Sequence, residues 1–484
     1  MQSIRALGCR AVWVALAASL MACDPSPFTA NWPAMRPLGR DFETYRPPTE
    51  PPPLSSEPEA SADTTPLADQ IEEPTGLLTL RQALALALMR NADLASFALE
   101  VRAAEARTLQ ASLLPNPQLD LEVENVAGSG EFHGANAAET TVTLSQLIEL
   151  GGKRSRRTNV AALERDLAGW DYETVRIAVL TEVAQRFVDV LALQHRVELA
   201  EEAATLADQV YDTVAKRVEA GAASPVEKIR AGIIVSTTRI ELQRVQRQLR
   251  AARYRLASTW SQTEPQFQAA AGQLELILPI PSAQSLTRLV SQNPQVARWA
   301  MEMAQRQAAV ALAKSQGVPD VTVGAAVRRL SETDDTAGVF ALSLPLPLFN
   351  RNQGGVLEAR FNVAKARQQR RAAEVRVRTA LAAVYHELAA AYSEAVALKT
   401  DVLPAARASF EAIQEAFRQG KLGYLDVLDA QRTLIDVQGR HIDALGAYHR
   451  AVAEAEGLIG QSLATVEPDA SHDTEPSPEP GDQP

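Results

Sequence analysis

The hydrophobic positions between Lys153 and Glu219 recur four and three residues apart, through about 66 residues that contain no proline. One such run consists of Leu180, Ala184, Phe187 and Leu191. This spacing keeps an apolar stripe on one side of a helix, and its length favours coiled-coil packing. At about 1.5 Å per residue the predicted helix is roughly 100 Å long, several times the thickness of a membrane core.

The long helix is predicted to end in a sharp reversal. Gly221 can take the left-handed conformation that follows many helices. Ser224, Pro225 and Glu227 then fit an N-cap, a first-turn proline and a capping-box glutamate of a return helix. The chain therefore travels far in one direction and turns back, a shape that suits a long tube better than a globular enzyme.

Between about residues 77 and 460 the same pattern occurs twice. Segments 90–94, 116–121 and 151–152 have counterparts at 292–296, 318–323 and 349–355, and Gly420 repeats the reversal at Gly221. Each copy holds a short helix of about 22 residues, a long leg of about 65 and a return helix of about 37. Because the two shorter helices together nearly equal the long leg, we predict antiparallel legs, one continuous and one broken, built twice. The second long leg is expected to run from about Gly355 to Gln419.

Each copy also contains two predicted strands in which apolar and polar residues alternate. In the first strand, one face is apolar and consists of Leu119, Leu121 and Val123. The opposite face is acidic and consists of Asp120, Glu122 and Glu124. Strands of about ten residues can cross a membrane when tilted, although a half-buried soluble sheet has the same pattern. Four strands cannot close a barrel, so membrane strands would require several chains to share one.

The predicted fold is therefore mainly α, with duplicated long antiparallel coiled coils and four β-strands per chain. Three chains would give a shared twelve-stranded membrane barrel with an open lumen, although the pattern itself does not set the number of chains.

The first residues read as an export signal. Arg5 and Arg10 precede the apolar run 11–21, and residues 20–23 resemble a bacterial lipobox in which Cys23 becomes the lipidated first residue. The alternative is an ordinary signal peptide with an incidental cysteine. We favour lipidation because Cys23 would be the only cysteine of the mature chain, where a free thiol is otherwise a liability.

The chain divides into five predicted parts. Residues 1–22 form the signal peptide, 23–76 a proline-rich tether, 77–262 the first repeat, 263–460 the second repeat, and 461–484 a disordered acidic tail. Abundant Ala, Leu, Gln, Arg and Glu with only 5% aromatic residues is typical of long helices. The net charge of −11 argues against a nucleic-acid partner.

No motif for catalysis or a cofactor is found in the sequence. The six histidines are scattered, no cysteine cluster accompanies them, and there is no phosphate-binding glycine loop, nucleophile elbow or HExxH. We therefore predict neither an enzyme, nor a cofactor, nor a tight metal site.

Two junctions between strand and helix resemble a known family. The run Leu144–Arg154 and the run Leu344–Gly354 are similar to the two junctions of TolC-like outer-membrane efflux factors, in the branch serving heavy-metal cation exporters of the cobalt-zinc-cadmium type. The resemblance covers nearly all of residues 77–460. It implies a homotrimeric channel-tunnel, with a barrel in the lipid of the outer membrane and helices that cross the periplasm to an adaptor protein and an inner-membrane RND pump.

The resemblance implies a passive exit duct for heavy-metal cations. One alternative is a duct for drugs or secreted polypeptide. An alternative of another class is a non-conducting periplasmic coiled-coil protein, although such a spacer has no need of the duplicated strand pairs.

The second reversal carries two carboxylates, Asp426 and Asp429, which match the acidic pair inside the closed tip of the family. Three residues apart near a helix start, both lie on one face, and three copies would form stacked acidic rings that attract cations. The alternative is that they are ordinary charges of a helix N-terminus. With Gly221 aligned to Gly420, the first reversal is expected to have Val226 and Arg230 where the second has Asp426 and Asp429, so only one reversal per chain supplies the pair.

The resemblance assigns roles to further residues. Contacts to the adaptor at the periplasmic tip are expected from Gly221, Ser224, Pro225, Gly420, Lys421, Leu422 and Gly423. Lys421 and Arg217 are candidates for a latch that holds the tip shut. The acidic side chains of the first strand, Asp120, Glu122 and Glu124, are expected to face the lumen.

Overall fold

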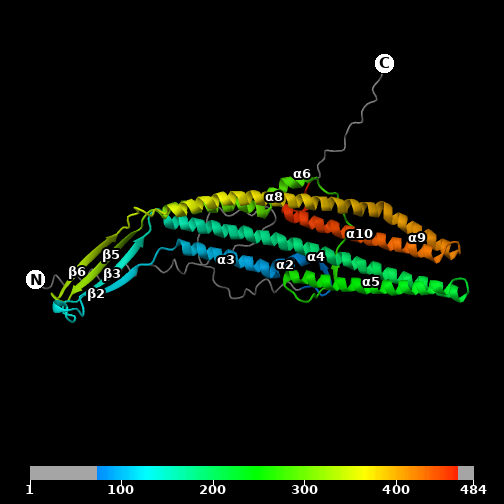
Figure 1. Cartoon of the computed structure of the whole chain (residues 1–484), viewed down its shortest axis with the longest axis horizontal. Helices are drawn as coiled ribbons and strands as arrows, with labels where there is room; N and C mark the ends of the chain where they lie inside the picture. Colours follow the sequence, from blue (N-terminus) through cyan, green and yellow to red (C-terminus); the bar gives the residue numbers. More distant parts are fainter. Residues whose placement is uncertain (1–72, 467–484) are drawn as a thin grey trace, which may run out of the picture.

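The computed structural model describes residues 73–466. The predicted signal peptide, Cys23, nearly all of the tether and most of the acidic tail therefore lie outside the described residues. The described chain is a mainly helical rod, with a β-sheet at one end and two helix reversals at the other (Figure 1). Among the helices of residues 73–466, none is both long and apolar enough to cross a membrane.

The helices and strands form two series with the same order. The first contains β1 (Leu77–Thr79), α2 (Leu80–Arg90), α3 (Ala92–Ser112), β2 (Gln118–Glu124), β3 (Glu139–Ile148), α4 (Lys153–Glu219) and α5 (Pro225–Ala257). The second contains β4 (Ala269–Ala271), α6 (Ala283–Leu289), α7 (Pro294–Ser315), β5 (Val321–Leu330), β6 (Asp335–Ser343), α8 (Gln353–Ala397), a π-turn (Leu398–Val402), α9 (Leu403–Arg418) and α10 (Tyr424–Ile459). The predicted order of short helix, strand pair, long leg and return helix is confirmed in each copy.

The first long leg is one helix of 67 residues, as its periodicity predicts. Val183, Phe187 and Leu191 lie on its buried side. The shorter helices α3 and α5 follow one another along α4, so this pair of legs has the predicted continuous and broken members (Figure 1).

The second long leg is not one continuous α-helix, and this part of the prediction is wrong. The π-turn at Leu398–Val402 separates α8 from α9. Pro404 explains the interruption, because a proline has no N–H to donate and its ring clashes with the carbonyl oxygen four residues earlier. Widening one turn of the helix to a π-turn relieves that clash, and the leg bends there toward α10 (Figure 1).

The two reversals use the same backbone geometry. Gly221 and Gly420 both have φ of +73°, in the left-handed region that favours glycine. Beyond Gly221, the N–H of Ala222 donates to the carbonyl of Arg217 at 2.8 Å, the bond typical of a Schellman motif. Ser224 is the N-cap of α5, but its hydroxyl accepts from the N–H of Val226 rather than from that of Glu227, so the expected capping box does not form.

One asparagine in each repeat links the start of the short helix to the end of the return helix. The Oδ1 atom of Asn91 caps α3, while its Nδ2 donates to the carbonyl of Thr259 at 2.8 Å. Asn293 caps α7 and donates to the carbonyl of Leu458 at 2.8 Å. The duplication read from the sequence therefore extends to individual hydrogen bonds.

The four long strands form one antiparallel sheet in the order β2-β3-β5-β6. The strand register places apolar residues beside apolar residues. Val142, for example, pairs with Leu121 on one side and with Val327 on the other. On the opposite face, Thr143 pairs with Asp120. One face of the sheet is therefore apolar at most positions of all four strands. The other face is polar on β2 and β3 and carries mainly small or apolar residues on β5 and β6, so the predicted alternation is clearest in the first strand pair.

A small domain midway along the rod was not foreseen. There β1 pairs in parallel with β4, and Trp260 and Phe267 are almost fully buried beneath them. Glu73, within the span predicted as tether, is buried too, and its carboxylate accepts bonds from the indole of Trp260 and the backbone N–H of Phe267. Strands of three residues so far apart in sequence leave no periodic signal.

Candidate functional site

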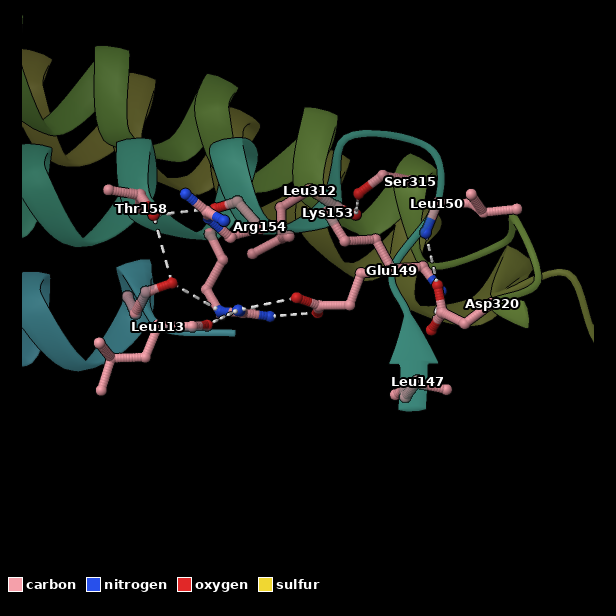
Figure 2. A network of polar contacts seen from close by, with 12 residues as sticks. Leu113, Leu147, Glu149, Leu150, Lys153, Arg154, Thr158, Leu312, Ser315 and Asp320 are labelled. Carbon is pink, nitrogen blue, oxygen red and sulfur yellow. Dashed lines mark hydrogen bonds and ion pairs between the residues drawn. The ribbon is translucent and has the colours of Figure 1, made fainter. Parts of the chain in front are cut away.

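At the first junction between sheet and helix, one carboxylate joins the two repeats (Figure 2). Asp320, just before β5, accepts from the backbone N–H of Leu150 at 2.9 Å and from Lys153 Nζ at 2.7 Å. Burial acts to raise the pKa of Asp320, but these hydrogen bonds and the charge of Lys153 outweigh it and hold that pKa below its usual value. The turn between β3 and α4 is thereby fastened to the start of β5.

Arg157 of α4 connects the same junction to the short helix α3. Its guanidinium makes a forked pair with Glu149, at 2.6 and 3.1 Å, which raises the pKa of Arg157. It also donates to the carbonyls of Ala111 and Leu113, where α3 ends. These bonds satisfy carbonyls that the end of a helix leaves unpaired.

The two junctions turn the chain with different residues. Gly151 and Gly152 have φ of +68° and +69°, and a Cβ on Gly151 would lie 2.9 Å from the side chain of Val318. In the second junction the left-handed residue is Asn352, with φ of +56°, and the expected glycine counterparts lie instead in the first turn of α8. Asparagine tolerates this region better than most residues, and here its side chain also donates to the carbonyl of Ala313.

The acidic residues predicted to face the lumen lie together on the polar face of the sheet. Asp120, Glu122 and Glu124 are exposed side chains of the edge strand β2. Sequence reasoning missed Arg328 of β5, whose guanidinium lies 3.7 Å from Glu124 and donates to Glu139 of β3 at 3.0 Å. The alternation of β5 predicts which face holds Arg328, but only the cross-strand register supplies its partners.

The two reversals lie at the other end of the rod (Figure 1). The residues predicted to contact an adaptor are exposed on them. Asp426 and Asp429 are exposed near the start of α10. Asp426 accepts from the backbone N–H of Gly423 at 2.8 Å, so it acts as a helix cap, whereas Asp429 has no side-chain partner among residues 73–466. Counted from Gly221 and Gly420, the residue of the first reversal that corresponds to Asp426 is Glu227 and not Val226, so that part of the comparison is corrected.

The two hairpins meet at the tip through aromatic residues. Of the two latch candidates, Arg217 lies with its guanidinium 4.6 Å from the ring centre of Phe417, whereas Lys421 forms no ion pair within the described chain. Tyr424 is buried beside them, and burial together with the charge of Glu227 raises the pKa of Tyr424 to about 12. The contact between Arg217 and Phe417 gives the expected latch a partner that the sequence did not reveal.

Comparisons with known proteins define the class. The profile of the outer membrane efflux protein family matches residues 83–262 and 286–461, once in each repeat. The chain therefore belongs to the outer membrane efflux protein family.

Individual relatives narrow the comparison. The cobalt-zinc-cadmium resistance protein CzcC of Cupriavidus metallidurans is 34% identical over 389 residues, covering 80% of this chain and 91% of CzcC. The nickel and cobalt resistance protein CnrC of the same organism is 27% identical and covers 65% of this chain and 73% of CnrC. The crystal structure of CusC superimposes with a TM-score of 0.67 at 18% identity, covering 79% of this chain and 92% of CusC, and so shares the fold.

Within residues 73–466 there is no group of three or more histidine, cysteine, aspartate and glutamate side chains placed to hold a metal ion. The polar features that could act on a passing ion are instead the exposed carboxylates of the sheet and of the tip.

Proposed function

We propose that the chain is the outer-membrane channel of a tripartite RND-type efflux system, and that it serves as a passive exit duct for heavy-metal cations. The observation that carries the proposal is the similarity to CzcC, which extends over nearly the whole of that protein. The rod supports it, because its two ends bear the exposed carboxylates that a cation path requires.

The duct is a homotrimer with a shared twelve-stranded barrel. Strands β2 and β6 are the two edges of the sheet, so each has one row of backbone groups without a strand partner among residues 73–466. Pairing β6 of one copy with β2 of the next would satisfy both rows and close a barrel. The apolar face favours lipid contact, since Leu119 is 73% exposed and Phe340 88% exposed in the single chain.

The opposite end of the rod meets the rest of the efflux system. The exposed turns around Gly221 and Gly420 contact a periplasmic adaptor protein, through which the duct joins an inner-membrane RND pump. The amino-terminal segment is anchored in outer-membrane lipid through Cys23, a residue outside the described part of the chain.

Metal tolerance tests this function. A strain lacking only this chain should become sensitive to some of zinc, cobalt, cadmium, nickel, copper and silver, and should keep its tolerance of organic antibiotics. Wild type should restore growth. Gly420→Val should not, because valine is strained at φ of +73°, whereas Gly354→Ala in the first turn of α8 is a matched control that should restore it.

Other outcomes would redirect the proposal. Sensitivity to antibiotics with normal metal tolerance would keep the duct and change its cargo to drugs. Normal tolerance of both, with a purified protein that forms no conducting trimer, would favour the non-conducting periplasmic coiled-coil protein instead.

A further inference from the structure

The loop end of the sheet places three acids in one cross-strand row on its polar face. Glu124 of β2 stands directly opposite Glu139 of β3, and Asp335 of β6 lies in the same row. We call these three residues the acidic row. Two like charges directly opposite each other destabilise a strand pair, so the pairing of Glu124 with Glu139 needs a compensating charge.

Arg328 supplies this compensating charge. It stands beside Thr141 in the register, one polar-face position from the acidic row. Its guanidinium donates to Thr141 Oγ1 at 3.0 Å and to Glu139 at 3.0 Å, and it lies 3.7 Å from Glu124. Thr141 is buried, so the guanidinium is held from both ends.

The neighbouring arginine provides a natural contrast. Arg329 points to the apolar face, because successive residues of a strand alternate, and it pairs with Asp334 in the turn. Among the charged residues of the four strands β2, β3, β5 and β6, Arg328 is the one cation on the polar face. The acids Asp120 and Glu122 on that face have no charged partner within the described chain.

We propose that Arg328 sets how strongly the loop end of the duct holds divalent cations, and so acts as a specificity-determining residue for release. This inference rests on the proposed function, in which the polar face lines the lumen. An ion path conducts only where binding is weak enough for the ion to leave. With Arg328 in place, Glu124 and Glu139 together keep one net negative charge per chain, and without it they would keep two.

The test uses the purified full-length protein in planar lipid bilayers. Ion selectivity is measured from the reversal potential in a KCl gradient, and Zn²⁺ is added from the loop side or from the tip side. Arg328→Gln should raise cation selectivity and lower the half-blocking Zn²⁺ concentration from the loop side about fivefold, as expected for one more partly screened charge at short range. Block from the tip side should not change.

Three further variants separate charge from structure. Arg329→Gln, on the other face, should behave as wild type. Arg328→Lys keeps the positive charge but cannot bond to Thr141 and Glu139 with a planar guanidinium. It should therefore keep the wild-type half-blocking Zn²⁺ concentration even where it lowers thermal stability. Glu139→Gln removes an acid instead and should raise the half-blocking concentration, which keeps the proposal testable where Arg328→Gln fails to assemble.

The failures are distinguishable. A wild-type protein that forms no conducting channel would overturn the proposed function. A conducting wild type in which Arg328→Gln matches Arg329→Gln, or in which Glu139→Gln leaves block unchanged, would overturn the role of Arg328 alone.

Discussion

Asp426 and Asp429 stand three residues apart on α10, yet different contacts hold them. Asp426 accepts from the N–H of Gly423, as a residue of a helix cap does, while Asp429 is exposed and its side chain has no partner among residues 73–466. The alternative interpretation, ordinary charges at the start of a helix, therefore fits Asp426 directly, and the proposed acidic ring is best tested at Asp429.

This difference yields a prediction. Replacing both residues by alanine should weaken cation selectivity and block by multivalent cations added from the tip side, and Asp429→Ala alone should carry much of that effect. Asp426→Ala should also lower stability by about 1 kcal/mol because the cap is lost. Bilayer recordings and thermal unfolding measure the two effects. Unchanged selectivity and unchanged block in the double variant would contradict the acidic ring.

At the junction, the pairing of Lys153 with Asp320 predicts a pH dependence. The pKa of Asp320 is lowered in the folded chain, so the stabilisation is fully present above the unfolded pKa of about 4 and is lost as pH falls through the folded value. Asp320→Asn should therefore lower the unfolding free energy by about 1 kcal/mol at pH 7, and by progressively less below about pH 4.

Denaturant unfolding at several pH values measures this difference. Glu374→Gln breaks an exposed ion pair with Arg370 on α8 and should show a smaller effect at every pH, because solvent screens exposed pairs. A constant difference between wild type and Asp320→Asn down to pH 3 would contradict the assignment.

Residue roles that depend on the backbone alone were predictable from the sequence. Gly221 and Gly420 were recognised because a helix that must reverse needs a left-handed residue. The partners of Arg328 and Arg217 were not predictable, since the contacts of a long side chain depend on which strand or helix lies beside it.

Among the elements, the two long legs have nearly equal lengths, but the first is one continuous α-helix and the second is interrupted by a π-turn. Hydrophobic periodicity predicted α4 correctly. It also predicted one continuous helix for the second leg, because the apolar stripe continues past Pro404. Hydrophobic spacing reports which side of a helix is buried. It does not report a local change of winding, which one missing N–H is enough to cause.

The π-turn should open more readily than the matching part of α4. We expect amides near residues 398–404 to exchange hydrogen about tenfold faster than those near 198–204, because fewer regular helix bonds protect them. Pro404→Ala restores a donor and should slow exchange there toward the rate of α4. Hydrogen exchange read by mass spectrometry measures both segments in one sample, and equal protection in the wild type would show that the turn is as rigid as the helix.

At the scale of the whole molecule, the repeats predict how copies of the chain meet. Within one chain, α10 of the second hairpin packs against α4, and Gly439 lies close against Arg196. The equivalent face of α5 is uncovered, with an apolar stripe formed by Val226, Ile229, Ile233 and Ile240. In a trimer this stripe would lie against the second long leg of the next copy.

Replacing Ile229 and Ile233 by aspartate should therefore leave a folded monomer in place of the proposed trimer, because buried unpaired charges are costly. Light scattering in detergent measures the mass, and circular dichroism checks the helices. The double valine variant keeps the stripe apolar and should remain trimeric. A trimer of unchanged stability in the aspartate variant would place the contact elsewhere.

The π-turn, finally, makes the long leg of the second repeat less stiff than the long leg of the first. Six hairpins around one axis would be alternately stiff and jointed, three with an unbroken α4 and three with a joint at Leu398–Val402. Such a tube would narrow if the hairpins with the π-turn bent inward at that turn, while the hairpins built on an unbroken α4 kept their position. Asp426 and Asp429 belong to the jointed hairpin, so closing the tube and concentrating charge at its narrowest level would be a single movement.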